Sequence, residues 1–141
     1  MSKFLLMALT FAYLCTPAIA QTPLRLWVRV MSDPQSGNTH YFDVNSLVST
    51  TNESGNRLNF FDSKIVFSRP VQSDVHFAII QVEISCTNRT IRSLRFEQYD
   101  AQERLIGVEQ LAYEWYNIPS TNTTAANIMN GFYTLACSEP S

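Results

Sequence analysis

The chain is poor in the residues that specify several common activities. It has 4 glycines in 141 residues, and none lies in the kind of glycine-rich loop that holds a phosphate group. It has 2 histidines, and no group of three or four ligands has the spacing of a zinc site. The 10 basic residues stand against 12 acidic ones, a net charge of −2 at pH 7. This balance argues against nucleic-acid binding and against a polybasic membrane patch, because both need an excess of basic residues.

No arrangement of residues indicates catalysis. No serine lies in the Gly-x-Ser-x-Gly pattern of a nucleophile elbow. His40 is close to Asp43 in the sequence, but strand ends are the simpler place for both His40 and His76. Five carboxylates are candidates for the acid pair of a glycoside hydrolase: Glu97, Asp100, Glu103, Glu109 and Glu114. Solvated strand faces and turns explain them more simply, so the sequence predicts neither an enzyme nor a cofactor.

The first 20 residues have the pattern of a cleavable secretion signal. Lys3 supplies a positive charge, residues 4–14 form an apolar run, and Ala18-Ile19-Ala20 provides a cleavage site. No second apolar run approaches the roughly 20 residues of a membrane helix. We therefore expect one exported domain over residues 21–141, without a transmembrane segment, in the periplasm, at the cell surface or outside the cell.

Export would leave two cysteines, Cys86 and Cys137, in a compartment where disulfides form and persist. Cys15 departs with the signal, and the bulky Leu14 before it argues against a lipid anchor there. Two cysteines allow one internal connectivity, so we predict a Cys86–Cys137 disulfide. Two free thiols, or a bond to a second chain, are the alternatives. The mature chain has no Cys-x-x-Cys pair, so a redox role is not expected.

Alternation of apolar and polar residues predicts a series of strands. The extended segments are residues 25–30, 40–44, 57–67, 75–86, 90–99 and 104–113, with a short piece at 115–118. Residues 45–48 are predicted as a turn or helical corner and residues 51–56 as a loop. A change of apolar face within residues 57–67 indicates a bulge or a twist. Pro70 is expected to stop the ladder after that strand, and Gly107 to mark another bulge.

The segment 75–86 has the clearest alternation. Its predicted dry face consists of Ala78, Ile80, Val82, Ile84 and Cys86. Its predicted wetter face consists of Ile79, Gln81, Glu83 and Ser85. An antiparallel sheet with one dry face needs a cover for that face. The only candidate is a segment after the helix breaker Pro119, with possible N-caps at residues 120–123.

Helical spacing marks this covering segment near the C-terminus. Its apolar stripe consists of Ala125, Ile128, Met129, Phe132 and Leu135. The predicted fold class is therefore α+β: a single antiparallel sheet of about six strands with a C-terminal helix packed on one face. Cys86 ends a strand and Cys137 ends the helix, so the disulfide would tether one to the other.

Aromatic residues and arginines are the features that favour binding. Trp27 lies on the strand face opposite Leu26 and Val28, and Trp115-Tyr116 lies near a turn. Four arginines cluster along one predicted hairpin: Arg89, Arg92, Arg95 and Arg104. Exposed aromatic residues beside arginines are typical of protein-binding surfaces. Ordinary solvated strand positions explain any one of them more simply, so the sequence does not identify the binding residues.

The sequence resembles the surface-adhesin protein E family of Gram-negative bacteria over nearly all of residues 26–137. The matching features are Trp27, Tyr41-Phe42-Asp43 before Val44-Asn45-Ser46-Leu47, Val82-Glu83-Ile84-Ser85-Cys86, Tyr99-Asp100, Trp115 with Ile118-Pro119-Ser120, and Cys137. The resemblance implies the same fold, an antiparallel sheet with a disulfide-tethered C-terminal helix. It also implies an adhesin that binds host matrix or serum proteins and can form a homodimer.

Two functions from different classes follow. The first is an exported, non-enzymatic binding protein that presents a sheet surface to a host extracellular or envelope protein. The alternative is a soluble periplasmic structural or inhibitor-like module with no host target, which the absence of a lipid-attachment pattern favours. A third possibility, a small enzyme or lipid carrier, would require a large apolar pocket.

Overall fold

An antiparallel sheet and a C-terminal helix make up the fold, in a computed structural model that describes residues 24–111 and 113–138. The strands are β1 (Trp27–Ser32), β2 (Thr39–Asp43), β3 (Val48–Thr51), β4 (Arg57–Val71), β5 (Val75–Ser85), β6 (Thr90–Tyr99), β7 (Leu105–Gln110) and β8 (Tyr116–Asn117). A 3-10 turn, η1 (Val44–Ser46), links β2 to β3, and the helix is α1 (Thr124–Cys137). The predicted signal, residues 1–20, lies outside the described residues.

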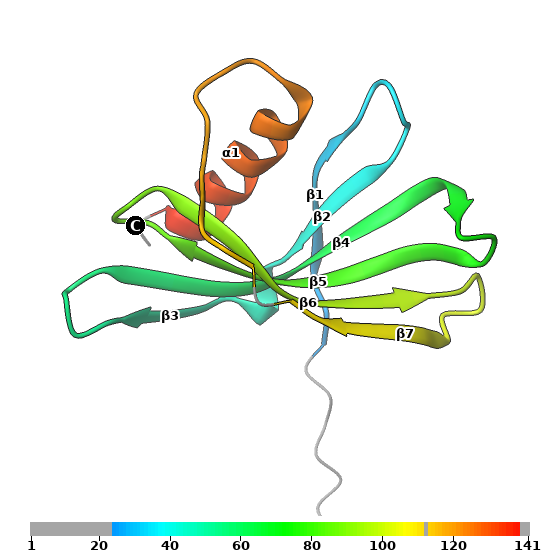
Figure 1. Ribbon diagram of the computed structural model, residues 1–141, viewed down its shortest axis with the longest axis horizontal. Helices are drawn as coiled ribbons and strands as arrows, with labels where there is room; N and C mark the ends of the chain where they lie inside the picture. The colour runs from blue at the N-terminus through cyan, green and yellow to red at the C-terminus, as the bar shows by residue number, and fades with distance from the viewer. Residues whose placement is uncertain (1–23, 112, 139–141) are drawn as a thin grey trace, which may run out of the picture.

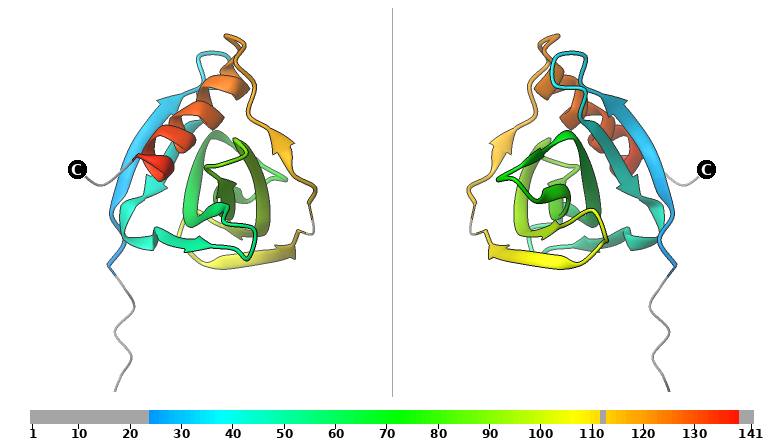
Figure 2. Two further views of the ribbon diagram at one scale, coloured as in Figure 1. Left: turned by 90° about the vertical axis from the view of Figure 1, so that its left-hand side faces the viewer. Right: turned by 90° about the vertical axis from the view of Figure 1, so that its right-hand side faces the viewer.

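The main path of the sheet has six strands in the order β1-β2-β4-β5-β6-β7, with β3 paired to β4 and β8 paired to β6. Each of these pairs is antiparallel. β1 and β7 lie at opposite edges, and α1 lies on one face, beside β1 and β2 (Figures 1 and 2). The predicted α+β fold is confirmed, and the two short strands β3 and β8 raise the strand count from about six to eight.

Strand β3 has no counterpart in the sequence-based prediction, which placed a corner up to residue 48 and a loop from residue 51. Val48 pairs with Phe60, and Thr51 pairs with Arg57. All four residues of β3 are exposed, so no apolar alternation marks this strand. The predicted corner is present just before it as η1.

Strand β4 continues through Pro70 to Val71, further than predicted, although its ladder with β5 is interrupted around this proline. Its pairing with β5 shifts register between Val66 and Val71, and a proline is tolerated in such an irregular stretch. The irregularity predicted at Gly107 is confirmed, because the pairing of β6 with β7 shifts register beside it. A Cβ atom at Gly107 would lie 2.6 Å from Oε1 of Gln98, so a larger residue there would displace the end of that side chain.

Of the bulge or twist predicted within residues 57–67, the bulge is absent from the pairing of β4 with β5. The described pairing of β4 with β5 runs unbroken from Leu58 to Val66. Phe60 and Phe61 simply point to opposite faces of the sheet, and apolar neighbours meet both of them. The apparent change of face therefore comes from a strand with apolar contacts on both sides.

Helix α1 packs on the sheet through a face slightly rotated from the predicted stripe. The buried helix residues are Ala126, Phe132 and Ala136. Ala125 and Leu135, which the spacing placed in the stripe, are exposed. The helix comes closest to the sheet where its side chains are small, and a stripe drawn through the larger residues misses those positions.

Two local features position the helix. Oγ1 of Thr123 accepts a hydrogen bond from the amide of Ala126 at 3.2 Å, a cap within the predicted range 120–123. At Gly131 a Cβ atom would lie 2.5 Å from Cγ1 of Val30, so this helix position contacts β1 without room for a side chain.

The core lies between α1 and the sheet. Phe61 is at its centre, with ring centroids 4.6 Å from Phe42 and 5.5 Å from Phe132. Val82 and Ile84 of β5 also belong to the buried cluster, as the predicted dry face requires. Full burial of such a side chain stabilises the fold by about 1.5–3 kcal/mol.

The predicted wetter face of β5 is not uniformly wet. Glu83 and Ser85 are 3% and 2% exposed, whereas Gln81 is exposed. Oε2 of Glu83 accepts a hydrogen bond from Nε of Arg92 at 2.5 Å, and Oγ of Ser85 accepts one from the amide of Asn88 at 3.1 Å. Burial of these polar groups is possible because each has a partner.

The predicted disulfide joins the residue after β5 to the last residue of α1. Cys86 and Cys137 are bonded, with their Cα atoms 5.6 Å apart. The alternatives of free thiols or a bond to a second chain do not hold in this structure. The bond closes a sequence separation of 51 residues and tethers the C-terminal end of the helix to the sheet.

Candidate functional site

The face of the sheet opposite α1 has no helix over it in the part of the chain that the structure describes (Figure 1). Because side chains alternate along a strand, the residues between the core positions point to this face. We call it the open face and define it by these residues: Arg25, Trp27, Asp62, Lys64, Phe77, Ile79, Gln81, Glu83, Arg92, Arg95, Glu97, Tyr99 and Trp115.

Cations lie over aromatic rings on the open face. Nζ of Lys64 lies 4.3 Å from the ring centroid of Phe77 and 5.6 Å from that of Trp27. The guanidinium of Arg25 lies 5.5 Å from the same Trp27 ring. Phe77 in turn stacks on Tyr99, with ring centroids 4.8 Å apart. These residues come from the segment before β1 and from β1, β4, β5 and β6, so the cluster spans the sheet.

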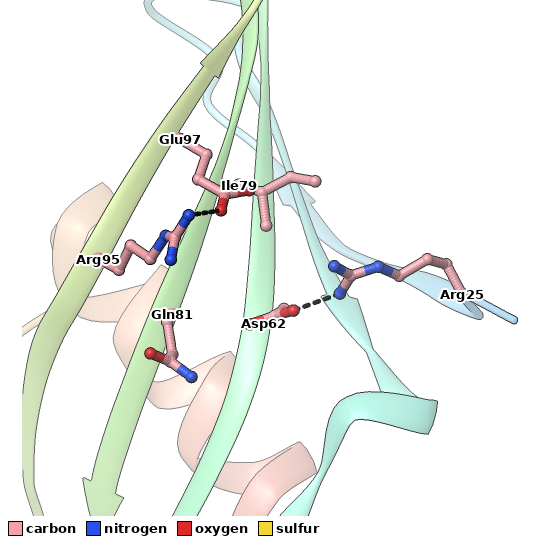
Figure 3. A pocket seen from close by; sticks show the side chains of 6 residues that line it. All are labelled: Arg25, Asp62, Ile79, Gln81, Arg95 and Glu97. Atoms are coloured by element: carbon pink, nitrogen blue, oxygen red, sulfur yellow. Dashed lines mark hydrogen bonds and ion pairs between the residues drawn. The ribbon is translucent and has the colours of Figure 1, made fainter. Parts of the chain in front are cut away.

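Six residues of the open face line a hollow of about 180 Å³ (Figure 3). Nη1 of Arg25 lies 3.0 Å from Oδ2 of Asp43 and also contacts Oδ2 of Asp62. Across the hollow, Nη2 of Arg95 lies 2.6 Å from Oε1 of Glu97. Nε of Arg95 is buried and has no hydrogen-bond partner among the described residues. Two opposite-charge pairs therefore line the hollow, and one arginine donor in it is unsatisfied.

A second hollow, of about 440 Å³, lies further along the open face beside Glu83, Arg92 and Trp115. The ion pair between Arg92 and Glu83 holds the guanidinium in place, and its carbon Cζ lies 4.6 Å from the ring centroid of Trp115. The cation is thus fixed between a buried carboxylate and an exposed indole.

Two groups on the open face have shifted pKa values that keep their charge state constant at neutral pH. Burial and, to a smaller extent, the hydrogen bond that its hydroxyl donates to Oε2 of Glu97 at 2.7 Å together raise the pKa of Tyr99 to about 12. Burial alone would lower the pKa of Arg25, but hydrogen bonds to Asp62 and Asp43 raise it overall. Tyr99 therefore remains a donor and Arg25 remains a cation.

The structure separates the four arginines that the sequence groups together. Arg92 and Arg95 lie on the open face, while Arg89 turns toward α1 and lies 4.5 Å from the ring centroid of Tyr133. Arg104 pairs with Asp100 at 2.7 Å in the turn before β7. A positive φ of 55° at Arg89 moves its side chain away from the strand alternation, which the sequence pattern could not reveal.

The histidines and carboxylates do not form one site. His40 borders a cavity beneath α1, and His76 borders a different hollow with Asp100 and Arg104. Glu97 and Asp100 are occupied by Arg95 and Arg104. Within residues 24–111 and 113–138, no group of three or more potential metal ligands comes together.

The sequence patterns did not single out Arg25, Asp62 and Lys64 of the open face. Asp62 and Lys64 lie in β4, where the aromatic residues dominated the pattern, and Arg25 lies next to its carboxylate partners only through pairing of distant segments. Phe60, Asp62 and Lys64 stand two residues apart, so in a strand they lie on the same face. This spacing could have placed the two charged residues on the open face.

The fold and this surface define a small α+β domain with a disulfide-tethered helix on one face of its sheet, while no helix covers the other face within residues 24–111 and 113–138. The chain belongs to the surface-adhesin protein E family, whose model matches residues 27–137. This membership supports an adhesin-like, exported or surface protein and favours a non-enzymatic role. No curated protein and no solved structure matches the chain. None of the helices in the described residues has the length and apolar character to cross a membrane.

Proposed function

We propose that the protein, exported as residues 21–141, is a non-enzymatic adhesin that binds a protein partner through the open face of its sheet. The observation that carries this proposal is the set of cations held over aromatic rings there. Lys64 lies between Trp27 and Phe77, and Arg92 lies over Trp115. Tryptophan, tyrosine and arginine dominate the energetics of protein interfaces, so this composition suits a binding surface.

The shape of the open face also favours a protein over a small molecule. Its two hollows are lined by charged and polar groups, so they lack the apolar enclosure of a typical ligand pocket. Ion pairs of both signs, Arg25–Asp62 and Arg95–Glu97, give a pattern that a complementary protein surface matches.

The edge of the sheet extends this surface. β7 ends the strand order, and its Leu105, Ile106 and Val108 are about half exposed, at 51%, 47% and 48%. Leu105 and Val108 pair with Tyr99 and Glu97, so they continue the open face. An unpaired apolar edge accepts a strand from another chain, from a host extracellular or envelope protein or from a second copy of this protein.

Capture from host serum and matrix extracts tests this proposal. The processed protein should capture a partner, and the charge reversals Lys64→Glu with Arg95→Glu should abolish the capture. Arg69→Glu is the matched control, because Arg69 is exposed at the far end of β4, outside the open face. Equal capture by all three proteins would contradict the choice of surface.

Cell fractionation separates the two exported alternatives. Exposure on intact cells favours adhesion, and release by osmotic shock favours a periplasmic module with no host target. Hydrolysis by the purified protein that is lost on changing one histidine or carboxylate would overturn the non-enzymatic assignment.

A further inference from the structure

A cavity of about 250 Å³ lies between the sheet and the first half of α1, on the face opposite the open face. Ile65, Ile80 and Ile91 line it from three strands, and Ile128, Met129 and Phe132 line it from the helix. Tyr113 and Tyr116, which are 47% and 59% exposed, border it from the segment before α1. The cavity therefore opens toward solvent beside two phenol rings.

Small side chains on the sheet account for the space. Ser63 of β4 and Ser93 of β6 point to the helix side, each one opposite a larger residue of β5. Larger apolar residues at these two positions would fill the gap beneath the helix. An apolar pocket of this size that opens to solvent is a candidate site for a ligand.

The size and lining suit an organic molecule better than water. The volume exceeds that of an engineered apolar cavity of about 150 Å³ that stays dry and binds benzene. Ligand sites are typically apolar enclosures with a few polar groups that fix the orientation of the ligand. Here those groups are the imidazole of His40 and the hydroxyls of Ser63 and Ser93.

Three polar groups at the cavity, those of His40, Ser63 and Ser93, are uncharged. Burial lowers the pKa of His40, against a smaller opposing effect of the Asp33 charge, so the imidazole is neutral at neutral pH. Arg92 also borders the cavity, but its guanidinium is engaged by Glu83 and Trp115 on the other face. The cavity therefore offers hydrogen bonds without a free charge.

We propose that this cavity binds a small uncharged organic molecule with an apolar, ring-containing body and one hydroxyl or carbonyl group directed at His40, Ser63 and Ser93. The site lies on the other side of the sheet from the partner-binding surface, and Arg92 borders both. If the protein carries a small molecule, this cavity is the place in the fold where it would bind.

Titration of the processed protein with 2-naphthol, followed by isoleucine and methionine methyl NMR signals, tests the proposal. We expect saturable shifts confined to the cavity residues, and no such shifts with naphthalene-2-sulfonate, which has a similar ring but carries a charge. Absence of saturable binding of 2-naphthol, or equal binding of the sulfonate, would overturn the proposal.

Variants that fill the cavity, compared with a control on the exposed surface, test whether the ligand binds there. Ser93→Leu should weaken 2-naphthol binding by about tenfold or more, while Ser49→Leu, on the exposed strand β3, should leave it unchanged. Met129→Trp fills the cavity from the helix side and gives a second test if Ser93→Leu fails to fold. Unchanged affinity in a folded, cavity-filled variant would contradict the assigned site.

Discussion

Asn59, on the central strand β4, donates a hydrogen bond from Nδ2 to the main-chain carbonyl oxygen of Ala136 in the last turn of α1. Both residues are buried, at 0% and 1% exposure. The same amide lies 3.4 Å from Sγ of Cys86, and the hydroxyl of Tyr133 donates to the carbonyl of Cys86 at 3.1 Å. The C-terminal half of the helix is therefore held by polar ties in addition to the disulfide.

Replacing Asn59 by leucine should destabilise the protein by about 1–3 kcal/mol, because the buried carbonyl of Ala136 loses its donor. Urea unfolding of the oxidised protein measures the free energy of unfolding. Asn127→Leu, on the exposed side of the same helix, is the matched control and should change stability by less than about 0.5 kcal/mol. Equal losses in both variants would show that the Asn59 tie contributes little.

Removing either sulfur atom should remove most of the stabilisation that the disulfide gives to the folded protein. For a separation of 51 residues the chain-entropy estimate is about 4 kcal/mol. Cys86→Ala and Cys137→Ala should therefore each lower the free energy of unfolding by a few kcal/mol, and the double variant should lose little more. Additive losses, measured by denaturant unfolding, would mean that the two sulfurs stabilise the protein separately.

Stability should fall as the pH drops below the ordinary pKa of histidine because of His40. Burial lowers the pKa of His40 from its usual 6.5, so the unfolded chain binds a proton more readily than the folded protein. The stabilisation is complete above pH 6.5 and is lost as the pH falls toward the lower folded pKa. His40→Gln should flatten this part of the stability profile, measured by urea midpoints between about pH 7.5 and pH 5. An unchanged slope in the variant would assign the effect to other groups.

The sequence predicted the parts of the fold that depend on local pattern. Alternation in residues 75–86 identified β5, and the positions of Cys86 and Cys137 gave the tether. Alternation failed for β3, since Val48 to Thr51 are all exposed and carry no apolar signal. Helical spacing placed α1 correctly but chose Leu135 over Ala136, because small residues at a close approach look unremarkable in a sequence.

The candidate site was less predictable because it depends on strand register. Arg25 meets Asp43 and Asp62 only after β1, β2 and β4 have paired. The four arginines form one group in the sequence. Arg89, however, is itself a turn residue with a positive φ, and its side chain lies on the helix side of the sheet. Single residues such as Trp27 could be singled out, but their cation neighbours come from other strands.

Site-specific photo-crosslinking tests the central claim, that the uncovered sheet surface contacts the partner. A photoreactive residue at Gln81, exposed in the charged hollow, is compared with one at Asn127, exposed on the outer side of α1. Binding at the open face predicts a covalent adduct with the captured partner from position 81 and none from position 127. An adduct from position 127 alone would contradict it and place the contact on the helix.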